Sequence, residues 1–131
     1  MYNETITFYS KTPPNKGELT NYSVKYYEDN SICGDDLDVY LKIEDNRIID
    51  FSFMGDTAII TTACASIFGE SIIDVGLNDV LRMDYNTIEE LIGMPVSPRR
   101  KQASVLGLLT TRNAIHDYLQ DGIKDDFDDV M

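Results

Sequence analysis

The sequence has few cysteines, few basic residues and no long apolar run. Two cysteines in 131 residues cannot form the disulfide framework of a small secreted domain, so we expect a reduced, cytoplasmic protein. Only 11 lysines and arginines stand against 23 acids, and this net charge of −12 argues against nucleic acid as an electrostatic partner. No apolar run reaches the roughly 18 residues of a membrane span, and residues 1–16 do not resemble a signal peptide. We therefore expect neither nucleic acid nor a membrane among its partners.

Length and composition indicate one globular domain. A chain of 131 residues with 43% hydrophobic residues can bury one sizeable core, but not two. We assign residues 1–123 to this domain. Residues 124–131 carry four aspartates and are expected to form a frayed acidic tail. The acid excess either serves solubility or favours docking to a basic partner protein.

Three segments have the alternating pattern of β-strands. Residues 23–28, 37–44 and 47–54 each alternate apolar with polar side chains. Residues 29–31 have a loop composition, and Asp45–Asn46 predicts a tight turn between the last two strands. Because these connections are short, the strands must pair as an antiparallel meander. The apolar faces of the second and third strands are Leu37, Val39, Leu41, Ile43, Ile49, Phe51 and Phe53.

One helix is predicted before this meander in the sequence, and one directly after it. Residues 2–9 place apolar side chains at roughly helical spacing, and Pro13 and Pro14 prevent the helix from continuing. Residues 57–68 are mostly small or apolar, which predicts a buried helix lying against the sheet. Gly69 is expected to close that helix.

Two more helices follow. Asn86 is the expected N-cap of a short helix that Gly93 stops. Ser97 and Pro98 suit the N-cap and first position of a final long helix. The apolar stripe of that helix is Ala103, Val105, Leu108, Leu109, Ile115 and Leu119. The predicted fold class is therefore α+β, with a three-stranded antiparallel sheet packed against several helices.

Six segments of the chain, taken in order, resemble the motifs of a known family. They are Tyr9–Gly17, Cys33–Gly34–Asp35, Asp50–Phe53 followed by Gly55, Thr61–Ser66, Ser97–Ala103 and Asn113–Ile115. With the predicted order of strands and helices, they resemble the iron–sulfur cluster scaffolds IscU, SufU and the N-terminal domain of NifU. The resemblance covers nearly the whole chain and implies the IscU/SufU-like fold.

The resemblance also implies a metal site, of which this sequence retains only part. Family members hold zinc or a nascent cluster with three cysteines and an aspartate or a neighbouring histidine. Cys33 and Asp35 match the first cysteine and the aspartate. The second and third cysteines fall on Ala58 and Ala103, and the position before the third falls on Gln102. Alanine has no donor atom, so Cys33 and Asp35 are the only ligands carried over.

Other residues are weaker candidate ligands. Asp56 and Gln102 could each add a weak contact, although Asp56 equally fits a carboxylate in a turn at a strand end. Cys64 lies six residues after Ala58, about 9 Å along a helix, and is expected to be a small buried hydrophobic residue. His116 is expected to be an ordinary surface or helix-end histidine.

The chemistry of Cys33 has two interpretations. It is either a residual thiolate ligand or persulfide carrier, or a relic packed in its loop. The neighbouring carboxylates Asp35 and Asp36 would raise the pKa of this thiol and weaken it as a nucleophile, whereas a bound cation would reverse the effect.

Arg99, Arg100 and Lys101 form the only basic cluster of an acidic chain. They stand at the expected start of a helix, where the helix dipole disfavours cations. The cluster is either the solvated first turn of a helix or a site for an anionic partner, and its unfavourable place at the helix start is an argument for the partner.

The resemblance leaves two functions open. The first is a scaffold-like protein that binds iron, zinc or a nascent cluster weakly through its depleted site. The second is a binding module with the same fold that docks or regulates a cysteine desulfurase or another assembly protein without holding a cluster. A zinc-dependent sulfurtransferase is the weakest alternative, because the acceptor position is Ala103, and we assign no catalytic residue. A homo-oligomer could add ligands from a second copy.

Overall fold

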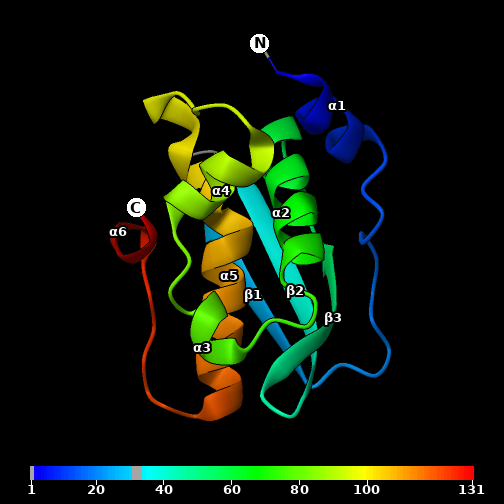
Figure 1. Ribbon diagram of the computed structural model, residues 1–131, viewed down its shortest axis with the longest axis vertical. Coiled ribbons are helices and arrows are strands. Elements are labelled where there is room, and N and C mark those ends of the chain that lie inside the picture. The colour runs from blue at the N-terminus through cyan, green and yellow to red at the C-terminus, as the bar shows by residue number, and fades with distance from the viewer. Residues whose placement is uncertain (1, 31–33) are drawn as a thin grey trace.

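The computed structural model describes residues 2–30 and 34–131 (Figure 1). The α+β class is confirmed, and the sheet has the predicted antiparallel order β1-β2-β3. The helices and strands are α1 (Glu4–Lys11), β1 (Val24–Asn30), β2 (Asp35–Glu44), β3 (Arg47–Met54), α2 (Ile59–Ser71), α3 (Leu77–Val80), α4 (Tyr85–Ile92), the 3-10 turn η1 (Pro98–Arg100), α5 (Lys101–Leu119) and α6 (Phe127–Val130).

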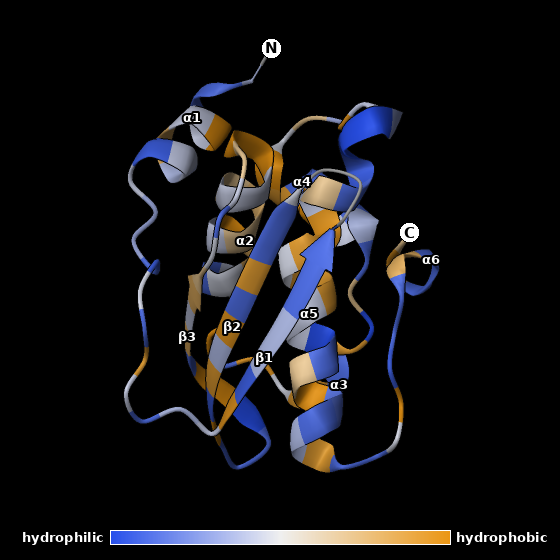
Figure 2. Cartoon of the chain, turned by 180° about the vertical axis from the view of Figure 1, so that it is seen from behind, coloured by the Kyte–Doolittle hydropathy of each residue, from blue (hydrophilic) through white to orange (hydrophobic). Residues whose placement is uncertain are grey.

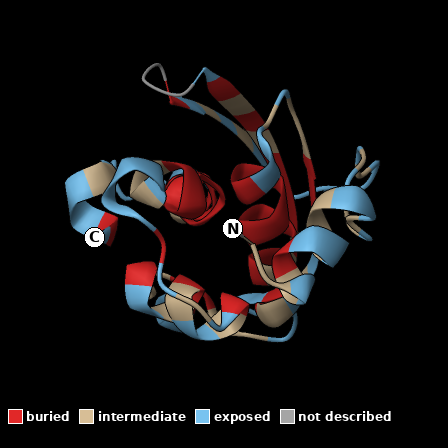
Figure 3. Ribbon diagram, turned by 90° about the horizontal axis from the view of Figure 1, so that it is seen from above, coloured by how far each residue is buried: buried red, intermediate tan, exposed pale blue. Residues whose placement is uncertain are grey.

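Helices α2 and α5 pack side by side against one face of the sheet (Figure 1). Seen from above, buried residues concentrate on these two helices and on the strands beside them (Figure 3). Along β2, polar and apolar residues alternate, as the period-2 pattern predicts (Figure 2). A Cβ atom at Gly107 of α5 would lie only 2.8 Å from the Cβ of Ala65 of α2, so glycine is needed for this close approach. The two helices therefore form the centre of the core.

The pairing of β2 with β3 differs from a regular alternation. Ile43 pairs with Ile48, whereas Lys42 pairs with Asp50, so Ile49 is an extra residue in a β-bulge. As a result Ile48 is buried and Ile49 is only half-buried. The prediction that Ile49 shares the core face with Phe51 and Phe53 is therefore wrong.

The first strand is longer than predicted. Asp29 and Asn30, expected in a loop, pair with Asp36 and Asp35 at the end of the ladder. The second strand accordingly begins at Asp35 rather than Leu37. This extension places the Asp35 carboxylate at the end of the sheet nearest to the start of α2. The predicted tight turn at Asp45–Asn46 is confirmed, with both residues at positive φ.

Helix ends also differ in detail from the sequence predictions. Gly69 lies inside α2, where its missing side chain leaves room for the Phe51 ring, and the helix continues to Ser71. Asp84, not Asn86, caps α4 by accepting a hydrogen bond from the Asn86 N–H. Gly93 ends α4 with φ +74°, as predicted.

The final long helix begins after a 3-10 turn. Pro98–Arg100 forms this turn, and the Ser97 side chain makes no capping hydrogen bond. Helix α5 is buried around most of its circumference rather than along one stripe, because the sheet, α2, α4 and α6 all contact it. Leu119 of the expected stripe is 41% exposed at the helix end.

The C-terminal segment does not match the expected frayed tail. Residues 127–130 form α6, whose N-terminus carries a reciprocal capping box between Asp126 and Asp129. Val130 is fully buried, and Phe127 packs on the same core. Apolar contacts therefore hold residues that their acidic composition suggested would be mobile.

His116 lies in the last turn of α5, so the expected helix-end position is confirmed, but it is not at the surface. It is 6% exposed, and its two ring nitrogens lie 2.7 Å from Asp121 Oδ2 and 3.0 Å from Asp125 Oδ2. Arg112 Nε donates to the same Asp125 oxygen at 2.9 Å. This network joins α5 to the segment that leads to α6. In the described part of the chain, no helix is long and apolar enough to cross a membrane.

Candidate functional site

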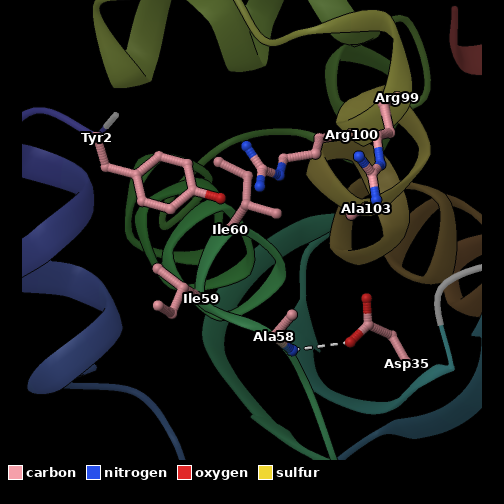
Figure 4. A pocket seen from close by; sticks show the side chains of 8 residues that line it. All are labelled: Tyr2, Asp35, Ala58, Ile59, Ile60, Arg99, Arg100 and Ala103. Carbon is pink, nitrogen blue, oxygen red and sulfur yellow. Dashed lines mark hydrogen bonds between the residues drawn. The ribbon is translucent and has the colours of Figure 1, made fainter.

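A pocket of about 560 Å³ lies where the start of β2, the start of α2 and the η1–α5 junction meet (Figure 4). Each of these elements contributes residues from its first turn or first position, so the pocket depends on the helix and strand starts described above. Its lining residues are Tyr2, Asp35, Ala58, Ile59, Ile60, Arg99, Arg100 and Ala103.

Asp35 lies in this pocket with both carboxylate oxygens hydrogen-bonded. Oδ1 accepts from the Ala58 N–H at 2.8 Å, and Oδ2 accepts from the Thr61 hydroxyl at 2.6 Å. The side chain of Ala58 cannot cap α2, so Asp35 supplies the carboxylate that the N-terminus of a helix favours. Asp35 is 4% exposed and fixes β2 to α2.

The structure brings three of the predicted metal-site positions together. Asp35, Ala58 and Ala103 line the same pocket, although they lie far apart in the sequence. The methyl groups of Ala58 and Ala103 leave two sides of the pocket without a donor atom (Figure 4). Cys33 lies outside the described residues.

Asp56 and Gln102 do not line the pocket. Asp56 is exposed, and its backbone exchanges hydrogen bonds with Asp36, whose Oδ1 accepts from the Asp56 N–H at 2.9 Å. Gln102 is half-buried on the first turn of α5. Gln102 is adjacent in sequence to the pocket residue Ala103, and Asp56 lies two positions before Ala58, but neither lines the pocket beside Asp35.

The basic cluster divides between two surfaces. Arg99 and Arg100 line the pocket, with the Arg100 guanidinium 5.5 Å from the centre of the Tyr2 ring. Lys101 instead lies over the Tyr85 ring, 4.7 Å from its centre. Among the described residues, only the two arginines therefore contribute positive charge to the pocket.

The second cysteine is not available to the pocket. Cys64 lies in the core cluster, and burial raises the pKa of its thiol to about 12. The expectation that Cys64 is a small buried hydrophobic residue is confirmed. Its thiol cannot act as a thiolate near neutral pH.

These residues do not fit a complete metal or cluster site. A zinc ion needs about four thiolate, imidazole or carboxylate donors, and an iron–sulfur cluster needs about four donors that are mostly thiolates. The sequence offers Cys33 as the one other thiol, and Ala58 and Ala103 offer none. Among residues 2–30 and 34–131, no group of three histidine, cysteine or acidic side chains could hold a metal ion. One chain alone therefore lacks the ligands for a cluster.

Four residues of the site were not predicted from the sequence. Thr61 holds Asp35, Tyr2 forms a wall of the pocket, and Ile59 and Ile60 line it from α2. Thr61 has a recognisable signal, because a hydroxyl in the first turn of a helix can reach a carboxylate at its N-terminus. Tyr2 has none, since its position follows from the packing of α1 on α2.

Comparison with known proteins identifies relatives of this chain. The family model described as the NifU-like N terminal domain matches residues 1–125. The iron–sulfur cluster assembly scaffold protein IscU of Thermotoga maritima is 33% identical over 90 residues, which are 69% of this chain and 61% of the relative. The chain thus spans less than two thirds of that relative. The scaffold protein IscU 1 of Archaeoglobus fulgidus is 25% identical over 92% of this chain and 78% of its own length.

Solved structures share the fold. One, described as an iron–sulfur cluster assembly scaffold of the SUF system from Fervidobacterium islandicum AW-1, matches with TM-score 0.77 and 22% identity over 87% of this chain and 96% of that chain. A NifU-like N-terminal protein from Brucella abortus matches with TM-score 0.74 and 16% identity over 92% and 95%. With the family model matching residues 1–125, the chain belongs to the NifU-like N-terminal domain family of iron–sulfur cluster assembly scaffolds.

Proposed function

We propose that this protein works in cytoplasmic iron–sulfur cluster assembly as a docking module. It binds a cysteine desulfurase or another assembly protein without holding a complete cluster on its own. The proposal rests on one observation: among the described residues, the pocket is lined by Ala58 and Ala103, to which the resemblance assigns two cysteines, and its carboxylate, Asp35, is held in hydrogen bonds to α2.

The rim of the pocket supports a role in docking. Ile59, at the start of α2, is 55% exposed and lines the same pocket as Arg99 and Arg100. A pocket with an exposed apolar side chain and two guanidinium groups suits a protein partner, because arginine is enriched in interfaces and pairs well with carboxylates. The partner surface would carry acidic residues around an apolar contact.

Binding to a cysteine desulfurase from the same organism tests the proposal. Biolayer interferometry is expected to detect saturable binding of the full chain. The R99E/R100E variant should bind about tenfold or more weakly, because it places negative charge against an acidic partner. Arg82, an exposed arginine outside this pocket, provides the control variant R82E. Absence of binding to any assembly protein, or equal losses in R99E/R100E and R82E, would contradict docking through this rim.

A second candidate function is weak metal binding. It is favoured by the retained Cys33–Gly34–Asp35 sequence and by the position of Asp35 in the pocket. A single chain would then hold iron or zinc only loosely, with a second copy adding ligands. Elemental analysis of the purified protein is expected to find clearly less than one metal ion per chain. Tight stoichiometric metal would favour the scaffold function over docking.

A further inference from the structure

The pocket at the family site has the size and lining of a site for a small organic molecule. Its volume of about 560 Å³ lies within the roughly 300–1,000 Å³ of such sites. Apolar and aromatic groups form most of its wall, and they come from the N-terminal segment, α2 and α5 (Figure 4). The apolar and aromatic lining residues are Tyr2, Ala58, Ile59, Ile60 and Ala103. The resemblance assigns metal-binding thiols to the positions of Ala58 and Ala103. This chain therefore has apolar surface there, which the apolar part of a ligand can cover.

The charged groups of the pocket differ in how they are paired. Asp35 accepts hydrogen bonds from Ala58 and Thr61, so its charge is already stabilised. Arg99 and Arg100 form no ion pair with any described residue, in a chain with 23 acidic residues. Their guanidinium groups keep hydrogen-bond donors for a ligand.

The two arginines lie on different sides of the pocket mouth. Arg100 extends toward Tyr2 and Ile60, whereas Arg99 lies beside Ala103 (Figure 4). A carboxylate is the group that a guanidinium binds best, through two parallel hydrogen bonds. Both arginines would repel a cationic ligand. A polyphosphate would bring more negative charge than the two arginines can neutralise, because Asp35 already adds one negative charge to the pocket.

We propose that this pocket binds a small organic acid that carries one carboxylate on an apolar body. The carboxylate pairs with Arg99 or Arg100, and the apolar body covers Ala58, Ile60 and Ala103. This inference concerns a free small molecule and therefore goes beyond the docking function, although both use the same rim.

Isothermal titration calorimetry of the full chain with benzoate tests the inference, with benzamide as the uncharged analogue of the same shape. Benzoate is expected to bind saturably with one site per chain, and benzamide about tenfold or more weakly. The R99Q/R100Q variant should lose about the same factor. R82Q removes an arginine elsewhere and should bind benzoate like the unmodified chain.

A second variant tests the position of the ligand. Ala58 is exposed, so A58L should fill the pocket without disturbing the core, and it should weaken benzoate binding while circular dichroism shows an intact fold. The inference is overturned if benzamide binds as well as benzoate, if R82Q weakens binding as much as R99Q/R100Q, or if no saturable binding occurs up to about 10 mM. Desulfurase binding is measured without benzoate, so failure of one proposal does not imply failure of the other.

Discussion

Asp35 joins the start of β2 to the start of α2 through both of its carboxylate oxygens. The resemblance places this aspartate beside metal-binding thiols and assigns two of those thiol positions to Ala58 and Ala103. In this chain the two hydrogen bonds of Asp35 give it a structural role that needs no metal.

Replacing Asp35 by alanine is expected to destabilise the protein. The Ala58 N–H and the buried Thr61 hydroxyl would each lose their acceptor, at a cost of about 1–3 kcal/mol in the free energy of unfolding. Urea denaturation measures this change. The matched control is D56A, since Asp56 is exposed and its side chain makes no described hydrogen bond. Equal stability of D35A and the unmodified protein would show that Asp35 is not structural.

The lowered pKa of Asp121 predicts how the free energy of unfolding depends on pH. Hydrogen bonds from the Ile123 N–H and from His116 lower its pKa from the ordinary value of 3.8. A lowered pKa in the folded state means that Asp121 adds stability above its unfolded pKa and loses it as pH falls through the folded value. The D121N variant should therefore lose less stability than the unmodified protein between about pH 5 and pH 2. Identical slopes of unfolding free energy against pH would contradict this role.

At the scale of elements, α6 is the helix that the acidic composition of residues 124–131 did not predict. Four aspartates between residues 125 and 129 suggest a disordered tail, but Phe127 and Val130 lie on the side that meets the core. The Asp126–Asp129 capping box and the pairing of Asp125 with Arg112 place the charges where they stabilise the segment.

Deleting residues 124–131 is expected to lower the melting temperature. The deletion removes the buried Val130 side chain and leaves Arg112 and His116 without Asp125, so a loss of several degrees is expected for a chain of this size. Calorimetry measures the shift. The V130D variant separates apolar packing from chain length, because it keeps all residues and should also be destabilised. An unchanged melting temperature in both variants would restore the interpretation as a frayed tail.

Elements with a strong local pattern could be predicted, whereas those set by distant contacts could not. The apolar face of β2 and the turn at Asp45–Asn46 follow directly from local sequence. The bulge at Ile49 does not, because an inserted residue looks like any other in an alternating segment. Gly69 resembles a helix end, and only the Phe51 ring packed against it explains why the helix continues.

The candidate site was predictable in its positions but not in its bonding. Motif resemblance placed Asp35, Ala58 and Ala103 in one region, and the pocket contains all three. The hydrogen bond from Thr61 to Asp35 and the wall formed by Tyr2 depend on how α2 meets β2 and α1. The buried network around His116 joins residues at irregular spacing, and no periodic pattern reveals it.

At the scale of the molecule, the protein has the fold, or frame, of its family, and the resemblance assigns alanine to two of the ligand positions. The residue 9–17 motif shows that the frame is intact: Asn15 exchanges hydrogen bonds with Ser66 of α2, and the chain beside it pairs with Phe53 of β3. The pocket that this frame builds carries Arg99 and Arg100 in a chain of net charge −12. The molecule is therefore organised to present a basic, partly apolar pocket.

Anaerobic cluster reconstitution with iron and sulfide, followed by desalting and visible absorbance per chain, tests the central claim most directly. The claim is that the frame is intact and the thiols at two positions are missing. The unmodified chain is expected to retain no stoichiometric chromophore, whereas the A58C/A103C variant should gain one that is lost again when C33S is added. A stable, stoichiometric cluster on the unmodified chain, dependent on Cys33, would contradict the account.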